Sequence, residues 1–106
     1  MGLFDFMKSP DINEGVKTCA ETQGAALLDV REPDEYAAGH IPGSVNLPLS
    51  EIRSAEDRFP DTDTPLFVYC LSGARSSKAI AALKEMGFMS MANLGGIRAW
   101  RGEIEK

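Results

Sequence analysis

The apolar positions of this chain follow two alternating patterns. Residues 25–30, apart from Asp29, and residues 66–69 are short apolar runs, which are typical of strands buried on both faces of a sheet. Residues 11–22, and residues 79–86 before Gly87, instead place apolar residues at helical spacing. This is the pattern of an amphipathic helix. In the first of these stretches Ile12, Val16 and either Cys19 or Ala20 share the apolar face.

Shorter elements complete the pattern, and capping and turn residues set their limits. We expect short helices over 33–39 and, capped by Ser50, over 51–57, strands over 44–47 and 88–94, and a terminal helical turn opened by Gly95 and Gly96. Strands that alternate with helices predict an α/β domain. Its sheet is expected to be small and mainly parallel, with helices on both faces and right-handed crossovers.

The length of the chain leaves room for one domain. It has 106 residues, of which 43% are hydrophobic and 25% charged, enough for a single core. Residues 1–10 show no clear period and are expected to form an N-terminal extension to a domain at 11–106. No apolar run approaches the roughly 20 residues of a membrane span, and no signal-peptide or lipidation pattern is found. We therefore expect a cytoplasmic protein with no membrane partner.

Charge is distributed unevenly along the chain. The net charge of −5 argues against nucleic acid as a partner, because proteins that neutralise phosphates present a basic face. Residues 64–101 nevertheless contain one carboxylate and five cations, a local charge of +4, which leaves −9 on the remainder. Such asymmetry can be a neutral property of solvated faces. Here the cationic half also contains the candidate nucleophile, which favours a small anionic substrate.

That nucleophile is Cys70, which ends the second apolar run. Residues 71–76 follow as a small polar loop before a helix, and such a loop directs N–H groups and the positive end of the helix dipole into an anion cradle. This field stabilises a thiolate, so we expect a lowered pKa for Cys70. Arg75 adds a cation with a planar set of donors. The alternative is that Cys70 is only a small buried hydrophobe.

The other chemically notable side chains have plainer explanations. Cys19 fits the apolar face of a helix, and a disulfide with Cys70 requires a proximity that the sequence does not establish. The single histidine, His40, lies in a Gly/Pro turn, where a structural role is usual. With no CxxC motif and no spaced cluster of ligands, neither a metal site nor a cofactor is expected.

Three blocks of sequence together carry a family resemblance. LLDVREPDEYAAGHIPGSVNLP (27–48), FVYCLSGARSSKAIAALKEMGF (67–88) and NLGGIRAW (93–100) resemble the rhodanese homology domain of single-domain sulfurtransferases. Three such motifs in the right order are far more specific than any one of them.

The resemblance implies a role for each matching position. Cys70 matches the sulfur-accepting cysteine, which attacks the outer sulfur of a donor such as thiosulfate, releases sulfite and becomes a persulfide. Asp29 and Arg31 match a polar pair with a mostly structural role, and Ser76 supports the loop. The other active-site loop positions, whose N–H groups are expected to hold the terminal sulfur, are Leu71, Ser72, Gly73, Ala74 and Arg75.

This chemistry needs hydrogen-bond donors more than a proton acceptor. A persulfide is acidic and carries its charge on an exposed sulfur, so a ring of amides suffices and no Cys/His pair is required. The expected donors are thiosulfate or a persulfide, and the expected acceptors are cyanide, a low-molecular-weight thiol or a protein.

Two other functions remain open. A cysteine phosphatase or arsenate reductase needs five residues between its cysteine and arginine, whereas four separate Cys70 from Arg75 and Ser76 occupies the required position. A sulfur-relay or regulatory binding module with little thiosulfate activity is the second alternative. Leu71 and Phe4 are its interface candidates.

Overall fold

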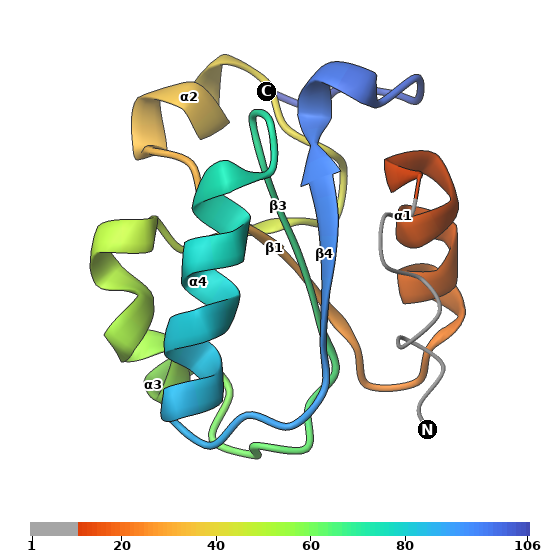
Figure 1. The fold of residues 1–106 in the computed structure, drawn as a ribbon. Coiled ribbons are helices and arrows are strands. Elements are labelled where there is room, and N and C mark those ends of the chain that lie inside the picture. The colour runs from red at the N-terminus through yellow and green to blue at the C-terminus, as the bar shows by residue number, and fades with distance from the viewer. Residues whose placement is uncertain (1–10) are drawn as a thin grey trace.

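The computed structural model describes residues 11–106 and is built around a four-stranded parallel sheet. The predicted extension 1–10, and with it Phe4, lies outside the described residues. In the order β2-β1-β3-β4, the strands are β1 (Ala26–Asp29), β2 (Val45–Asn46), β3 (Leu66–Cys70) and β4 (Met91–Gly96). Because the strands are parallel, their carboxyl ends meet at one edge, which is the upper edge in Figure 1.

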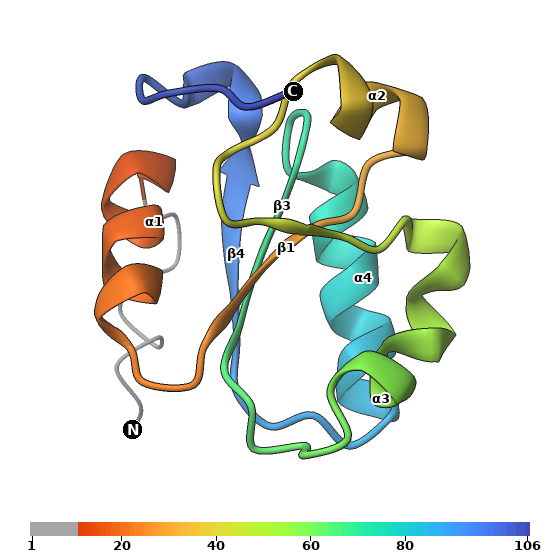
Figure 2. The same cartoon turned by 180° about the vertical axis from the view of Figure 1, so that it is seen from behind.

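Helices cover both faces of the sheet, which confirms the predicted α/β class. Helix α1 (Ile12–Glu21) packs on one face, while α3 (Ala55–Arg58) and α4 (Ala74–Glu85) lie on the other (Figures 1 and 2). Helix α2 (Pro33–Ala38) lies near the carboxyl edge of the sheet. Residues 11–106 also contain the 3-10 helices η2 (Leu49–Ser54) and η3 (Ile97–Ala99). Among residues 11–106, no helix has the length and apolar character needed to cross a lipid bilayer.

Strand β3 is the centre of the core because it pairs with a strand on each side and is covered on both faces. None of its five residues is more than 1% exposed. Successive side chains point to opposite faces, so Phe67 and Tyr69 pack on the α1 side while Leu66, Val68 and Cys70 pack on the α4 side. Strand alternation therefore places Cys70 on the face covered by α4.

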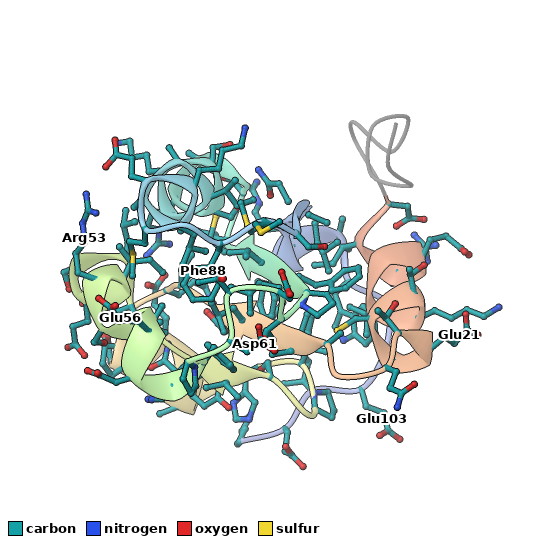
Figure 3. The ribbon with its side chains drawn as sticks, turned by 90° about the horizontal axis from the view of Figure 1, so that it is seen from below. Glu21, Arg53, Glu56, Asp61, Phe88 and Glu103 are labelled. Atoms are coloured by element: carbon teal, nitrogen blue, oxygen red, sulfur yellow. The ribbon has the colours of Figure 1, made fainter. Side chains whose placement is uncertain are left out.

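The last strand begins later than the sequence pattern predicts. Gly87 adopts a φ of +102°, and the N–H of Phe88 then donates to the Leu83 carbonyl at 3.1 Å, which closes the end of α4. The Phe88 side chain consequently points into the core on the α4 side, whereas the labelled Glu21 and Arg53 lie at the periphery (Figure 3). The helix-ending turn thus takes the residue that was expected to open the strand.

Gly95 and Gly96 end β4, and Gly96 is also the N-cap of η3, the helical turn expected to begin here. A register shift between Val68 and Tyr69 leaves these glycines opposite Tyr69 and Cys70, and the helical turn follows as η3. The strand is extended because its carboxyl end continues to pair with the end of β3.

The segment expected as a helix capped by Ser50 is also different in detail. It begins at Leu49 as a 3-10 helix after Pro48, with the N–H of Glu51 donating to the Pro48 carbonyl at 2.8 Å. The Ser54 hydroxyl donates to the Glu51 carbonyl at 2.8 Å, and only then does the α-helical turn of α3 form.

A buried ion pair fixes the carboxyl end of β1. The Nη2 atom of Arg31 lies 2.7 Å from Asp29 Oδ2, with the two side chains 7% and 0% exposed. The same Nη2 donates to the Gly39 carbonyl at 2.7 Å. The pair therefore ties the end of β1 to the turn that follows α2, and this places the predicted polar pair in a structural setting.

We expect Arg31→Ala to lower the free energy of unfolding by roughly 3–5 kcal/mol, because it leaves the Asp29 carboxylate buried without its partner. Urea unfolding at neutral pH measures this loss. Arg53→Ala is the matched control, since Arg53 and its partner Glu85 are 66% and 68% exposed and exposed pairs contribute little. Equal losses in the two variants would contradict the assignment.

Candidate active site

Cys70 lies at the carboxyl edge of the sheet, at the junction between β3 and α4. Gly73 has a φ of +107° and serves as the N-cap of α4, so the chain reverses within three residues. The helix starts at Ala74, earlier than the predicted loop end at Ser76. Ala74 and Arg75 therefore belong to the first helical turn, whose N–H groups have no acceptor within the helix.

The Cys70 sulfur is surrounded by hydrogen-bond donors. Gly73 N lies 2.9 Å and Ser76 N 3.4 Å from Cys70 Sγ, and in its thiol form Cys70 donates to Ser76 Oγ at 3.6 Å. Cys70 is only 1% exposed, whereas Leu71 beside it is 40% exposed. The loop thus encloses the sulfur and presents its own residues to solvent.

These donors determine the acidity of the thiol. Burial raises the pKa of Cys70, but the surrounding hydrogen bonds outweigh burial and hold the pKa below its usual value. In order of effect, the donors are the Ser76 hydroxyl and the backbone N–H groups of Ser76, Gly73 and Ser72. A thiolate held in this way is the reactive form of a cysteine nucleophile.

Arg75 is paired with a carboxylate that the sequence did not indicate. Its Nη1 lies 2.7 Å from Glu35 Oε1 and its Nη2 3.0 Å from Glu35 Oε2. The two side chains are 31% and 30% exposed, and the hydrogen bonds from Arg75 lower the pKa of Glu35 to about 2. The positive charge expected at the rim of the anion cradle is therefore balanced by α2. No local pattern pointed to Glu35, because it lies forty positions from Arg75.

The end of β4 supports the loop from behind. A Cβ atom at Gly96 would overlap the carbonyl oxygen of Leu71 and approach Ser72 Cα to 2.7 Å. Asn93, three positions earlier, accepts the Ser76 hydroxyl at 2.7 Å. The sequence pattern assigns no role to the NLGGIRAW block, although its Gly-Gly pair is a sign of close backbone approach.

The other predicted residues, Asp29, Arg31 and His40, have structural contacts. Arg31 donates both to the Asp29 carboxylate and to the Gly39 carbonyl, so the pair holds the turn after α2. His40 belongs to the same turn and stacks on Tyr36, with ring centroids 3.7 Å apart. Among residues 11–106, no group of three or more His, Cys, Asp or Glu side chains could hold a metal ion.

Cys19 belongs to a different part of the molecule. It packs in the core on the α1 side, across the sheet from Cys70, and both thiols are free. Burial raises the pKa of Cys19 to about 11. A cavity of about 380 Å³ between α1 and β1 is lined by Cys19, Val16 and Leu27 among others, and it contains no residue of the Cys70 loop.

A comparison with protein families identifies this arrangement. The model of the rhodanese-like domain matches residues 13–103. The chain belongs to the rhodanese-like domain family. A crystal structure of a rhodanese-like domain protein from Staphylococcus aureus aligns with a TM-score of 0.79 at 30% identity, over 93% of this chain and 97% of that one.

Curated relatives of this rhodanese-like domain carry several names. The uncharacterized protein YqhL of Bacillus subtilis is 40% identical over 82 residues, 76% of this chain and 64% of YqhL. The putative sulfur carrier protein YrkF of the same species is 39% identical over 80 residues, 74% of this chain and 43% of YrkF. The thiosulfate sulfurtransferase GlpE of Pseudomonas fluorescens is 42% identical over 80 residues, 74% of this chain and 72% of GlpE. The matched segment thus spans less than two thirds of YqhL and YrkF.

We expect Gly96→Ala to reduce the reactivity of Cys70 by at least about tenfold, because the new methyl group displaces the Leu71 carbonyl and with it the loop donors, each such hydrogen bond to a charged group being worth about 1.5–3 kcal/mol. The rate of alkylation of Cys70 at neutral pH measures this effect. Gly24→Ala is the control, because Gly24 has a φ of +77° but open space around it. That variant should lose stability and keep the wild-type alkylation rate, and the same rate in Gly96→Ala would refute the steric argument.

The Glu35–Arg75 pair predicts a dependence of stability on acid pH. The pKa of Glu35 is about 2 in the folded protein, below the 4.5 of an ordinary glutamate. The pair therefore stabilises the fold fully above the ordinary pKa, and this contribution is lost as the pH falls from 4.5 towards 2.

Across this window, the free energy of unfolding should fall more steeply in the wild-type protein than in Glu35→Gln. Urea unfolding at several pH values measures both slopes. Glu85→Gln removes a carboxylate from an exposed pair and should follow the wild-type slope. Parallel curves for wild type and Glu35→Gln would show that the pair contributes nothing.

Proposed function

We propose that this protein is a sulfurtransferase that carries a sulfane sulfur as a persulfide on Cys70. The observation that supports this function is the set of donors around the sulfur, with Gly73 N at 2.9 Å and Ser76 N at 3.4 Å. Backbone donors of this kind stabilise a negative charge on sulfur without removing a proton. The name of GlpE, a relative described as a thiosulfate sulfurtransferase, favours the same chemistry.

The reaction has two displacement steps. The Cys70 thiolate attacks the outer sulfur of thiosulfate, a new S–S bond forms, and the donor S–S bond breaks so that sulfite leaves with the electron pair. An acceptor nucleophile such as cyanide, a thiol or a protein thiolate then attacks the outer sulfur of the persulfide. That step regenerates the Cys70 thiolate. No proton needs to be transferred in either displacement, which agrees with a site built from donors.

The charge of the donor is met chiefly by the loop backbone in this proposal. Arg75 is already engaged by both oxygens of Glu35, so the N–H groups of the loop and of the first turn of α4 bind the anion. The same engagement weighs against phosphatase or arsenate reductase chemistry, which needs an arginine free to clasp a tetrahedral oxyanion. The four-residue spacing between Cys70 and Arg75 weighs against it as well.

A second candidate is a sulfur relay between proteins. Cys70 is nearly inaccessible while Leu71 is 40% exposed beside it, so a partner that docks on the loop reaches the outer sulfur of a persulfide more readily than the thiol beneath it. The relative YrkF is described as a putative sulfur carrier. In this form of the proposal both donor and acceptor are proteins, and turnover with thiosulfate is slow.

We expect incubation with thiosulfate to add the mass of one sulfur atom to the wild-type protein and none to Cys70→Ser, because a hydroxyl does not accept sulfane sulfur. Intact-mass spectrometry before and after addition of cyanide measures this gain and its removal. Cys19→Ser is the matched control and should gain sulfur as the wild type does, since burial raises the pKa of Cys19 to about 11.

Sulfur gain in Cys70→Ser would overturn the assignment of the nucleophile. If the wild type gains no sulfur from thiosulfate but does so from a low-molecular-weight persulfide, the relay is favoured over the thiosulfate enzyme. If it gains sulfur from neither, the thiosulfate enzyme is refuted, and a relay then requires sulfur gain from a persulfide carried by a donor protein.

A further inference from the structure

Asn93 lies on β4, next to the loop that holds Cys70, and its side chain has a defined orientation. The N–H of Gly95 donates to Asn93 Oδ1 at 2.8 Å. A backbone N–H can only donate, so the atom that receives it is the amide oxygen. The Ser76 hydroxyl lies 2.7 Å from this same oxygen and must donate its proton to bond with it.

The amide nitrogen of Asn93 faces the start of α4. Its Nδ2 donates to Ser77 Oγ at 2.9 Å and to the Gly73 carbonyl at 3.4 Å. Asn93 therefore contacts the N-cap residue and two residues of the first helical turn. A single side chain connects strand β4 to the N-terminus of α4.

Two of these contacts go to the residues that hold the nucleophile. Gly73 and Ser76 donate their backbone N–H groups to Cys70 Sγ at 2.9 and 3.4 Å. Gly73 has a φ of +107°, and glycine in this region is free to change conformation unless its neighbours fix it. The Gly73 carbonyl and the Ser76 hydroxyl are the groups through which Asn93 fixes them.

We propose that Asn93 is a positioning residue that keeps the Gly73 and Ser76 donors on the Cys70 sulfur and so sets the reactivity of the nucleophile. The proposal rests on the proposed role of Cys70 and deepens it, since it assigns the control of Cys70 to a residue on the neighbouring strand. Charged groups near the sulfur belong to other elements: Arg75 lies on α4, and its partner Glu35 lies on α2. Neither is hydrogen-bonded to Asn93, so they serve as a constant background in the test.

Asn93 has a second effect on the Cys70 thiolate that opposes its positioning effect, and the test must separate the two. The Ser76 hydroxyl has one proton, and Asn93 Oδ1 at 2.7 Å and the Gly73 carbonyl at 2.9 Å compete for it with the sulfur at 3.6 Å. If competition dominated, removal of Asn93 would strengthen the hydrogen bond to a thiolate. If positioning dominates, removal of Asn93 loosens all the donors and weakens the thiolate. The two actions therefore shift the pKa of Cys70 in opposite directions.

The experiment measures the rate of alkylation of Cys70 by iodoacetamide against pH, in a Cys19→Ser background so that one thiol reacts. We expect Asn93→Ala to raise the midpoint of this profile by about one pH unit, which means about tenfold less thiolate well below the midpoint. At high pH, where Cys70 is fully ionised with and without Asn93, the two alkylation rates should converge. A purely structural role would lower the thermal midpoint of unfolding and leave the alkylation midpoint unchanged.

Two further variants locate the effect. Ser77→Ala removes one hydrogen-bond partner of Asn93 without touching the donors of Cys70, and it should retain the wild-type profile. In a Ser76→Ala background, Asn93→Ala should shift the midpoint by clearly less than it does alone, because residues that act through one another are not additive. Should Asn93→Ala fail to fold, Asn93→Ser gives the same test with a side chain too short to reach α4.

An unchanged or lowered alkylation midpoint in the folded Asn93 variant overturns the proposal, as does full additivity with Ser76→Ala. Alkylation does not require sulfur transfer. A raised midpoint together with no sulfur gain from any donor would therefore retain the positioning role of Asn93 and refute the proposed function alone.

Discussion

The hydrogen bonds that converge on the Cys70 sulfur are the interaction on which the rest of this structure depends. They exist because β3 is buried on both faces and ends under the N-terminus of α4, where Gly73 turns the chain with a φ of +107°. N–H groups that a helix cannot satisfy internally are thereby directed at one sulfur atom. A buried thiol normally resists ionisation, and here the donors reverse that tendency.

Paired charges shape the surroundings of this site. Arg31 is buried against Asp29, and Arg75 is held by Glu35, so neither guanidinium acts as a free cation. The positive charge of residues 64–101 therefore acts on Cys70 more weakly than the net +4 of this segment indicates. In the proposed sulfur transfer, backbone dipoles, which need no counter-ion and do not move, are therefore the main source of attraction for an anionic donor. Such a site suits a sulfur that carries its charge through successive transfers.

Strand β4 acts as the support behind the loop. Gly96 allows the Leu71 carbonyl to approach without a side chain in the way, and Asn93 connects the strand to the first turn of α4. Together they bring the last sequence block into contact with the cysteine loop. The loop is short, and the strand that contacts it through Asn93 lies 20 residues after Gly73 in the chain.

The sequence by itself determined the α/β class, the order of the elements and the position of Cys70 between a buried strand and a helix. The spacing of apolar residues, the helix caps and the turn glycines are local properties, because each depends on residues that are close together in the sequence. Only the tertiary structure decided that Glu35 engages Arg75, that Asn93 engages Ser76 and that Gly96 lies under Leu71. These contacts join residues far apart in the chain, and those of Asn93 and Gly96 follow from the parallel register of β3 and β4 with its shift at Val68 and Tyr69. A register is set by the packing of whole strands, so no local pattern contains it.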